Sequence, residues 1–282
     1  MQIINTDPAL GVTAKDGSVY YSLGSNLWTQ LTSGPHAKDT YSYSPQGGPG
    51  WKDGEFATMN MAKWDTNWYS AKMRLEKALG FGTYEQSIKV GKGSGVITAF
   101  YLSEHDVDQI QEIDFEFSGH CNPLSSPDYT CGTAFVQTNV WHNGQQFPFP
   151  DKLWVHDEPQ PPPYPDSTQG WGFNVYRYKI DWGPNVVSWF VDRSGSGTNY
   201  KFLRSHDISK FDYQEQLLFP FISFWVDVKD GVPGWSPDGS KFDFGQSATG
   251  DCGPSGKCYQ AFFFQSLKFT PHKSNKITRI GS

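Results

Sequence analysis

The chain has 282 residues and a formal net charge of −6. This acidic balance, together with the absence of any basic run, argues against nucleic acid as a partner, and no apolar stretch approaches the roughly 20 residues that a membrane helix needs. Its 29 glycines and 19 prolines together make about 17% of the 282 residues, above the usual combined share of about 12%. This excess predicts many turns and little helix. The 11 tryptophans are too many for a core that must satisfy every indole N–H, so some are predicted to line a binding surface.

Short apolar or alternating runs recur along the chain between turn signals, which is the pattern of an all-β sandwich. The predicted strands cover residues 18–23, 84–90, 95–102, 110–117, 134–141, 174–181, 186–192, 217–228 and 260–269. The weak helical candidate is 59–68. Since no repeat, charge block or linker divides the chain, we predict a single domain over residues 1–282, with a polar C-terminal tail at 273–282.

The segment from His142 to Gly172 is rich in proline and is predicted to be one long loop. A loop of this length in a compact domain is usually functional. Its aromatic residues, Trp171 among them, are candidates for one wall of a binding cleft, whereas the alternative is a rigid surface excursion.

The stretch from Glu112 to Phe117 alternates three carboxylates with three large apolar side chains. Strict alternation indicates a β-strand, so Glu112, Asp114 and Glu116 share one face while the apolar residues share the face that enters a core. Repulsion within the acidic set is expected to raise the pKa of at least one carboxyl group, which is how a general acid is made at neutral pH. A solvated acidic face and a metal site are the alternatives, and the crowding favours a catalytic set.

The spacing of Glu112 and Glu116 fits glycoside chemistry. Four strand residues span roughly 13 Å between Cα atoms. Side chains that lean together would bring the carboxyl groups to about 5–7 Å, whereas retaining glycosidases need about 5–5.5 Å and inverting ones about 6.5–9.5 Å. Spacing alone therefore leaves the stereochemistry open.

Four cysteines form two close pairs, Cys121 with Cys131 and Cys252 with Cys258, each around a turn-rich segment. Three pairings are formally available, and we expect the two local disulfides. Zinc ligation would favour tighter spacing, so no metal site is predicted there. Disulfides predict an oxidising, secreted or extracellular setting, although the residues after Met1 lack the features of a signal peptide.

Beyond the acidic strand, several further segments resemble glycoside hydrolase family 16, in particular its lichenase and xyloglucan endotransglucosylase/hydrolase branch. The hexapeptide Glu-Ile-Asp-Phe-Glu-Phe at 112–117 is similar to the active-site strand of that branch, in the form without a bulge residue. The other similar segments are 82–89, 95–103, 136–147, 153–154, 178–182, 189–192 and 222–225. Together they cover roughly residues 70–270 in the family's order.

The resemblance implies a concanavalin-like β-jelly roll of two curved antiparallel sheets with a concave substrate cleft, carried by a single catalytic domain. It also implies retention through a covalent glycosyl-enzyme, with Glu112 as nucleophile, Glu116 as acid/base and Asp114 as the charge modulator between them. No cofactor is required, and a structural calcium ion is a further expectation from the family. The implied partner is a polysaccharide, and we expect a monomer.

Strand parity supplies the candidate sugar contacts. One face carries Gln137, Asn139 and Trp141, and another carries Ser223 and Trp225. For both tryptophans, stacking on a sugar ring competes with packing in the core. Two further aromatic candidates are Tyr101 and Trp171, while two histidines, His105 and His120, flank the acidic strand off its alternation and are expected in loops.

Three functions remain in competition. The leading one is a retaining endo-glucanase acting on β-1,3-1,4-glucan or a xyloglucan-like chain. A transglycosylase would use the same residues, because only the partition of the glycosyl-enzyme between water and an acceptor sugar separates the two. A non-catalytic lectin is disfavoured because all three carboxylates are present. Many relatives have Arg where this chain has Ser87, and lichenases often have Asn at the position of Ser223, so the substrate stays open.

Overall fold

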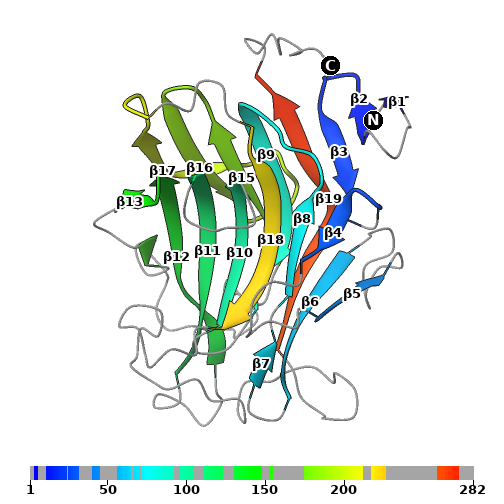
Figure 1. Ribbon diagram of the computed structural model, residues 1–282, viewed down its shortest axis with the longest axis vertical. Coiled ribbons are helices and arrows are strands. Elements are labelled where there is room, and N and C mark those ends of the chain that lie inside the picture. The colour runs from blue at the N-terminus through cyan, green and yellow to red at the C-terminus, as the bar shows by residue number, and fades with distance from the viewer. Residues whose placement is uncertain are drawn as a thin grey trace.

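The computed structural model describes residues 3–5, 11–23, 25–31, 40–44, 56–64, 67–69, 71–91, 96–104, 111–122, 130–147, 153–154, 175–211, 217–226 and 259–272. Within these ranges every regular element is a β-strand, and the strands form two antiparallel sheets that pack against each other (Figure 1). The predicted all-β sandwich is confirmed. The same ranges contain no helix of the length and apolarity needed to span a membrane.

The larger sheet has 11 strands, and its main path runs β1-β2-β3-β19-β9-β15-β16-β17. A branch of β6 with β5 and β7 joins it at β19. The bounds are β1 Ile3–Asn5, β2 Val12–Ala14, β3 Val19–Ser22, β5 Thr40–Ser44, β6 Phe56–Trp64, β7 Asn67–Tyr69, β9 Gly82–Lys89, β15 Tyr176–Trp182, β16 Val186–Asp192, β17 Lys201–Asp207 and β19 Tyr259–Pro271.

The smaller sheet has eight strands in the order β13-β12-β11-β10-β18-β8-β4, and β14 also pairs with β12. Its bounds are β4 Trp28–Gln30, β8 Ala71–Leu75, β10 Val96–Ser103, β11 Gln111–Asn122, β12 Thr130–His142, β13 Gln145–Phe147, β14 Leu153–Trp154 and β18 Phe219–Val226. In Figure 1 this sheet lies toward the viewer, with β10 and β11 near its middle. The acidic strand is therefore a central strand, paired on both sides.

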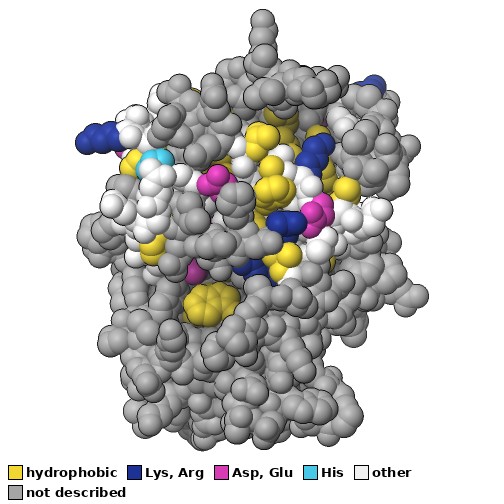
Figure 2. All heavy atoms as spheres, viewed as in Figure 1, with side chains coloured by type: hydrophobic (Ala, Val, Ile, Leu, Met, Phe, Trp, Pro, Cys, Tyr) yellow, Lys and Arg dark blue, Asp and Glu magenta, His cyan; other side chains and the backbone are white. Residues whose placement is uncertain are grey.

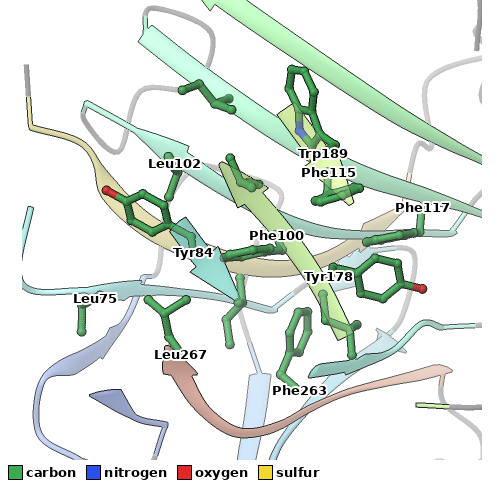
Figure 3. Close-up of a cluster of buried hydrophobic side chains, with 14 of the residues drawn as sticks. Leu75, Tyr84, Phe100, Leu102, Phe115, Phe117, Tyr178, Trp189, Phe263 and Leu267 are labelled. Atoms are coloured by element: carbon green, nitrogen blue, oxygen red, sulfur yellow. The ribbon is translucent and has the colours of Figure 1, made fainter. Parts of the chain in front are cut away.

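The main core fills the space between the two sheets. Ile113, Phe115 and Phe117 of β11 enter it with no exposed surface, as the alternation predicted. Tyr178 of β15 meets Phe115 and Phe117 from the opposite sheet, with ring centroids 5.5 and 4.5 Å apart (Figure 3). Since removing a buried Phe side chain costs about 3–5 kcal/mol, this contact fixes the back of the acidic strand firmly.

The prediction of one long loop from His142 to Gly172 is wrong in its described parts, because 145–147 and 153–154 are strands that pair with β12. A two-residue turn connects β12 to β13, with φ of 51° at Asn143 and 75° at Gly144. Positive φ at both positions is the geometry of a type I′ hairpin, for which Asn-Gly is the preferred sequence. The rest of this segment lies outside the described residues.

Two further expectations are wrong. The helix expected over 59–68 is absent, since 56–64 and 67–69 are β6 and β7. Met59 of β6 is fully buried and lies between β5 and β19, so pairing on both sides overrides the helical pattern. His120 is not in a loop, because β11 continues to Asn122 and pairs His120 with Gly132. His105 lies outside the described residues.

Candidate active site

The three carboxylates of β11 lie on the face of the eight-stranded sheet that points away from the main core, which we call the outer face. Alternation places them there, because their apolar neighbours on the strand are all in the core. Glu112 is 8% exposed, Asp114 is 1% exposed, and Glu116 is partly exposed. The strand therefore presents its acidic row within a largely covered part of this face.

Each carboxylate lies between two neutral residues of the adjacent strands. On β10, Ser103, Tyr101 and Ala99 are opposite Glu112, Asp114 and Glu116 in that order. On β12 the corresponding residues are Trp141, Asn139 and Gln137. Directly opposed residues of an antiparallel pair share a face, so the predicted contacts from β12 are brought beside the carboxylates, one for each.

Two amide side chains of β12 are oriented at this face. Gln137 Nε2 donates to Glu116 Oε2 at 3.5 Å, which is long for a hydrogen bond but directs the amide toward the carboxyl group. Asn139 is 3% exposed, and its Oδ1 accepts a hydrogen bond from the Val140 backbone N–H at 2.9 Å. This contact sets which end of the Asn139 amide faces away from its own backbone.

Both candidate tryptophans belong to the outer face rather than to the core. Trp141 is opposite Glu112 and is partly exposed. Trp225 of β18 is opposite Ile97 and is partly exposed, while Ser223 is opposite Ala99 in the same row as Glu116. Partly exposed indole rings on the face that carries the carboxylates are suited to stacking on a sugar.

Tyr101 also lies on the outer face but is 5% exposed. Its ring is parallel to that of Phe221 on β18, with centroids 4.9 Å apart and planes 9° apart. Together with Ala99 they form a second apolar cluster, separate from the main core, which Leu31 and Phe219 join. Tyr101 therefore contributes to the floor of this face.

Four further residues of this face were not predicted from the sequence: Lys72 and Arg74 of β8, and Phe219 and Phe221 of β18. Alternation was the available signal, because each is two residues from another outer-face position. Arg74 lies over the Phe219 ring at 5.1 Å and forms an ion pair with Glu76 at 2.9 Å. Burial alone would raise the pKa of Glu76, but hydrogen bonds from Thr29 and Arg74 hold it below its usual value.

Figure 2 views the molecule from the side of this sheet. Hydrophobic, basic and acidic side chains lie close together on the part of the surface that the structure describes. The face thus combines charged groups with aromatic and aliphatic surface, which is what a site for a polyhydroxylated ring requires.

A closed ring of hydrogen bonds joins the start of β11 to the β12–β13 turn, on the core side of the sheet. His142 Nδ1 is 2.8 Å from Gln111 Oε1, Gln111 Nε2 donates to Asn143 Oδ1 at 3.0 Å, and Asn143 Nδ2 is 3.1 Å from His142 Nε2. Because an amide oxygen accepts and an amide nitrogen donates, the ring requires neutral His142 with its proton on Nδ1. Gln111 and His142 alternate with Glu112 and Trp141, so the ring lies on the face opposite to the acidic row, where His142 stacks on Phe211, and it anchors the β12–β13 turn to β11.

Comparison with known proteins gives this arrangement a family. The model of glycosyl hydrolases family 16 matches residues 38–228, which is more than half of the chain and includes the whole acidic strand. The chain belongs to glycosyl hydrolases family 16.

The individual relatives of known activity share modest sequence identity with this chain, over less than half of its length. A xyloglucan endotransglycosylase/hydrolase protein 8 from Oryza sativa subsp. japonica is 33% identical over 119 residues, which is 40% of this chain and 32% of that protein. A beta-glucanase from Paenibacillus macerans is 28% identical over 124 residues, covering 43% of this chain and 42% of that protein. The matched segments span less than half the length of either relative.

The solved Bacillus licheniformis beta-glucanase superposes with a TM-score of 0.58 and 17% identity, covering 92% of this chain and all of that one. At this identity the likeness concerns the fold, and it agrees with the jelly roll expected for family 16.

Several predicted residues of the family 16 chain cannot be placed. Trp171, Cys252 and Cys258 lie outside the described residues. Among those that are described, no group of three or more His, Cys, Asp or Glu is arranged to hold a metal ion, so the structural calcium remains a prediction from the family.

Proposed function

We propose that this family 16 chain is a retaining, endo-acting glycosidase that cleaves a β-glucan-type polysaccharide, either β-1,3-1,4-glucan or a xyloglucan-like chain. The observation that carries the proposal is the acidic row of β11, with three carboxylates on one face and a neutral residue of β12 beside each. A structural role would not need three negative charges side by side on a central strand.

In this proposal Glu112 stays ionised and attacks the anomeric carbon, forming a glycosyl-enzyme as the glycosidic bond breaks. Glu116 donates its proton to the leaving oxygen and then takes one from the water that releases the sugar. Asp114 lies between them, and its negative charge favours the protonated form of a neighbouring carboxyl group. The hydrogen bond from Gln137 orients Glu116 for both proton transfers.

Substrate binding follows the same rows. Trp141 stacks on a sugar ring near the nucleophile, and the amides of Asn139 and Gln137 bind hydroxyl groups near Asp114 and Glu116. Ser223 and Trp225 extend the row of contacts across β18 in the other direction. Sugar contacts spread over several strands suit the interior of a polysaccharide chain, which supports endo action.

Transglycosylation is the second candidate, and the similarity to the rice endotransglycosylase/hydrolase favours it. The glycosyl-enzyme is the same, and an acceptor sugar then replaces water in the second step. The same carboxylates therefore serve both reactions, and the supply and binding of the acceptor decide between them.

A panel of β-glucans tests both candidates. We expect wild-type protein to shorten β-1,3-1,4-glucan or xyloglucan from within the chain, and proton NMR at early times to show the product with retained β configuration. Adding a labelled oligosaccharide acceptor would produce labelled polymer if transfer dominates. Inversion at the anomeric carbon, or no cleavage of any member of the panel, would contradict the proposal.

We further infer that Cys121 and Cys131 form a disulfide and that the protein acts outside the cell. The two residues are direct partners across the β11–β12 ladder. Opposed Cα atoms in an antiparallel pair are about 4.5–5.5 Å apart, within the range that a disulfide bridges. Peptide mapping without reductant should recover the linked pair, whereas free thiols at both positions would refute the inference. Cys252–Cys258 is predicted from spacing alone.

A further inference from the structure

We propose that Lys72 forms a sugar-binding subsite away from the scissile bond, where its ammonium group binds a hydroxyl oxygen of the polysaccharide. The inference rests on the proposed glycosidase function. It adds a basic residue of β8, outside the family motifs in the sequence, to the substrate contacts.

Alternation along β8 directs Lys72 to the outer face. Ala71, Met73 and Leu75 are buried in the main core, whereas Lys72 is partly exposed on the other side of the strand. Lys72 is opposite Ser223, which is opposite Ala99, which in turn is opposite Glu116. The three sites thus extend the row of the proposed acid/base toward the edge of the sheet.

The length of this row decides which part of the substrate Lys72 can meet. Neighbouring strands are about 4.8 Å apart, so three steps separate the Lys72 and Glu116 backbones by roughly 14 Å. That span is longer than a single pyranose ring. Lys72 therefore serves a sugar farther along the chain than the one attacked at the anomeric carbon.

Two buried rings hold the Lys72 ammonium in place. Nζ is 5.0 Å from the centre of the Phe221 ring and 5.6 Å from that of Tyr101, and the two rings stack on each other. Ring faces attract a cation at these distances. A lysine side chain normally loses much rotamer entropy when it binds, and an ammonium group that is already held loses less.

The chemistry of this spot suits a sugar hydroxyl. An ammonium group has three N–H donors and no acceptor, so it pairs with oxygen lone pairs. Phe221 and Tyr101 are 0% and 5% exposed, so an incoming sugar meets Lys72 rather than their ring faces. The Ser223 hydroxyl is on the opposed residue and adds a donor and an acceptor.

Lys179 of β15 provides a matched control. Its Nζ is 4.1 Å from the centre of the Phe190 ring and 4.3 Å from that of Tyr200, which is the same type of contact. It lies on the other sheet, where Tyr176, Tyr178 and Ile180 on the opposite face of its strand enter the core. Replacing it removes an equivalent charge on rings at a place remote from the acidic row.

The test measures kcat/KM on β-glucan oligosaccharides of increasing length for wild type, K72M, K72R and K179M. Methionine keeps an unbranched apolar stem on the rings and removes the charge. We expect K72M to lower the ratio of kcat/KM for long over short substrates roughly ten-fold, the effect of losing a hydrogen bond to a charged group. K72R should recover most of this ratio, and K179M should match wild type.

An unchanged ratio in K72M, or the same change in K179M, would overturn the proposal. Affinity electrophoresis through gels that contain the polysaccharide gives a readout independent of turnover, and K72M should be retarded less than wild type. If wild type binds but does not cleave, the proposed function fails while Lys72 is still tested. If K72M and wild type are retarded equally, Lys72 is not a subsite residue.

Discussion

The carboxylates of the two sheets differ in the residues that are placed around them. On the eleven-stranded sheet, Asp192 at the end of β16 is fully buried and accepts six hydrogen bonds from the segment that follows it. Its Oδ1 accepts from the N–H and hydroxyl of Ser194, and its Oδ2 from the Ser196 hydroxyl and the backbone N–H groups of Gly197, Thr198 and Asn199, at 2.6–3.2 Å.

Glu85 of β9 follows the same rule. Lys268 Nζ is 2.9 Å from one of its oxygens, and Arg177 Nε is 3.4 Å from the other. The Tyr200 hydroxyl donates to the second oxygen at 2.5 Å. Cations and donors therefore surround this charge from three other segments of the chain.

The acidic row of β11 has a different environment, because the residues opposite it on β10 and β12 are neutral and its nearest charged neighbours along the strand are other carboxylates. The comparison teaches how to separate structural from functional carboxylates. Asp192 and Glu85 are surrounded by donors or cations from other segments of the chain, whereas strand alternation brings the three β11 carboxylates onto one face, between neutral residues of β10 and β12.

The largest effect should come from the acidic row. We expect Glu112→Gln and Glu116→Gln each to lower kcat by at least about 10³-fold, because no other group replaces a nucleophile or an acid/base. The unfolding temperature should stay close to that of wild type, since the amide has the same shape. Steady-state kinetics and thermal melts measure the two quantities.

Glu85→Gln is the matched control for these variants, since it makes the same chemical change on the other sheet. It should lower the melting temperature by disturbing its ion pairs while leaving kcat nearly intact. Near-normal turnover in either β11 variant would remove that residue from the mechanism.

The sequence predicted this contrast only in part. The alternation at 112–117 correctly separated the core face from the acidic face, because a central strand obeys parity on both sides. The hydrogen bonds of Asp192 could not be predicted from alternation, because their donors lie in the irregular segment 194–199 and depend on its loop geometry. Lys72 and Phe221 are adjacent only through strand pairing across the sheet, which no local pattern encodes. The helix expected at 59–68 was wrong for the same reason, because partners distant in sequence decide its structure.

The second effect concerns stability. Asp192→Ala should lower the free energy of unfolding by about 2–4 kcal/mol, because several donors lose a charged acceptor at once. Chemical denaturation monitored by tryptophan fluorescence measures the change. Catalytic turnover at a temperature where the variant is folded should remain close to wild type, and a large loss of kcat would show that the two sheets are coupled.

The pH dependence of the same variant sharpens the comparison. Burial alone would raise the pKa of Asp192, but the hydrogen bonds from Ser194, Asn199 and Ser196 outweigh it and hold the pKa well below the ordinary 3.8. A depressed folded pKa gives stability that is present above the unfolded value and is lost as pH falls below it. The stability difference between wild type and Asp192→Ala should therefore shrink as the pH falls below about 4. A difference that stays constant from pH 7 to pH 3 would contradict this account.

A smaller effect is expected from the tryptophans of the outer face. Trp141→Ala and Trp225→Ala should raise KM several-fold with a modest change in kcat, because ring stacking contributes about 0.5–1.5 kcal/mol to both bound states. Trp189→Ala, in the main core, is the contrasting variant and should cost about 3–5 kcal/mol of stability. A similar stability loss in Trp141→Ala would show that its ring is structural.

The smallest effect should come from Asp114→Asn. The variant keeps the nucleophile and the acid/base but removes one charge between them. We therefore expect a moderate loss of kcat and a shift of the acidic limb of the profile of kcat/KM against pH. The profile of kcat/KM against pH measures it. An unmoved profile would remove Asp114 as a modulator of its neighbours.

Direct labelling of the nucleophile tests the central claim, that the acidic row of β11 performs retaining catalysis. Wild-type protein would be incubated with an activated 2-deoxy-2-fluoro β-glucoside oligosaccharide, which accumulates the glycosyl-enzyme, and the attachment site would be located by tandem mass spectrometry of proteolytic peptides. We predict a stoichiometric ester on Glu112. A label on any other residue, or no label while the same substrate is turned over with release of its leaving group, would contradict the account.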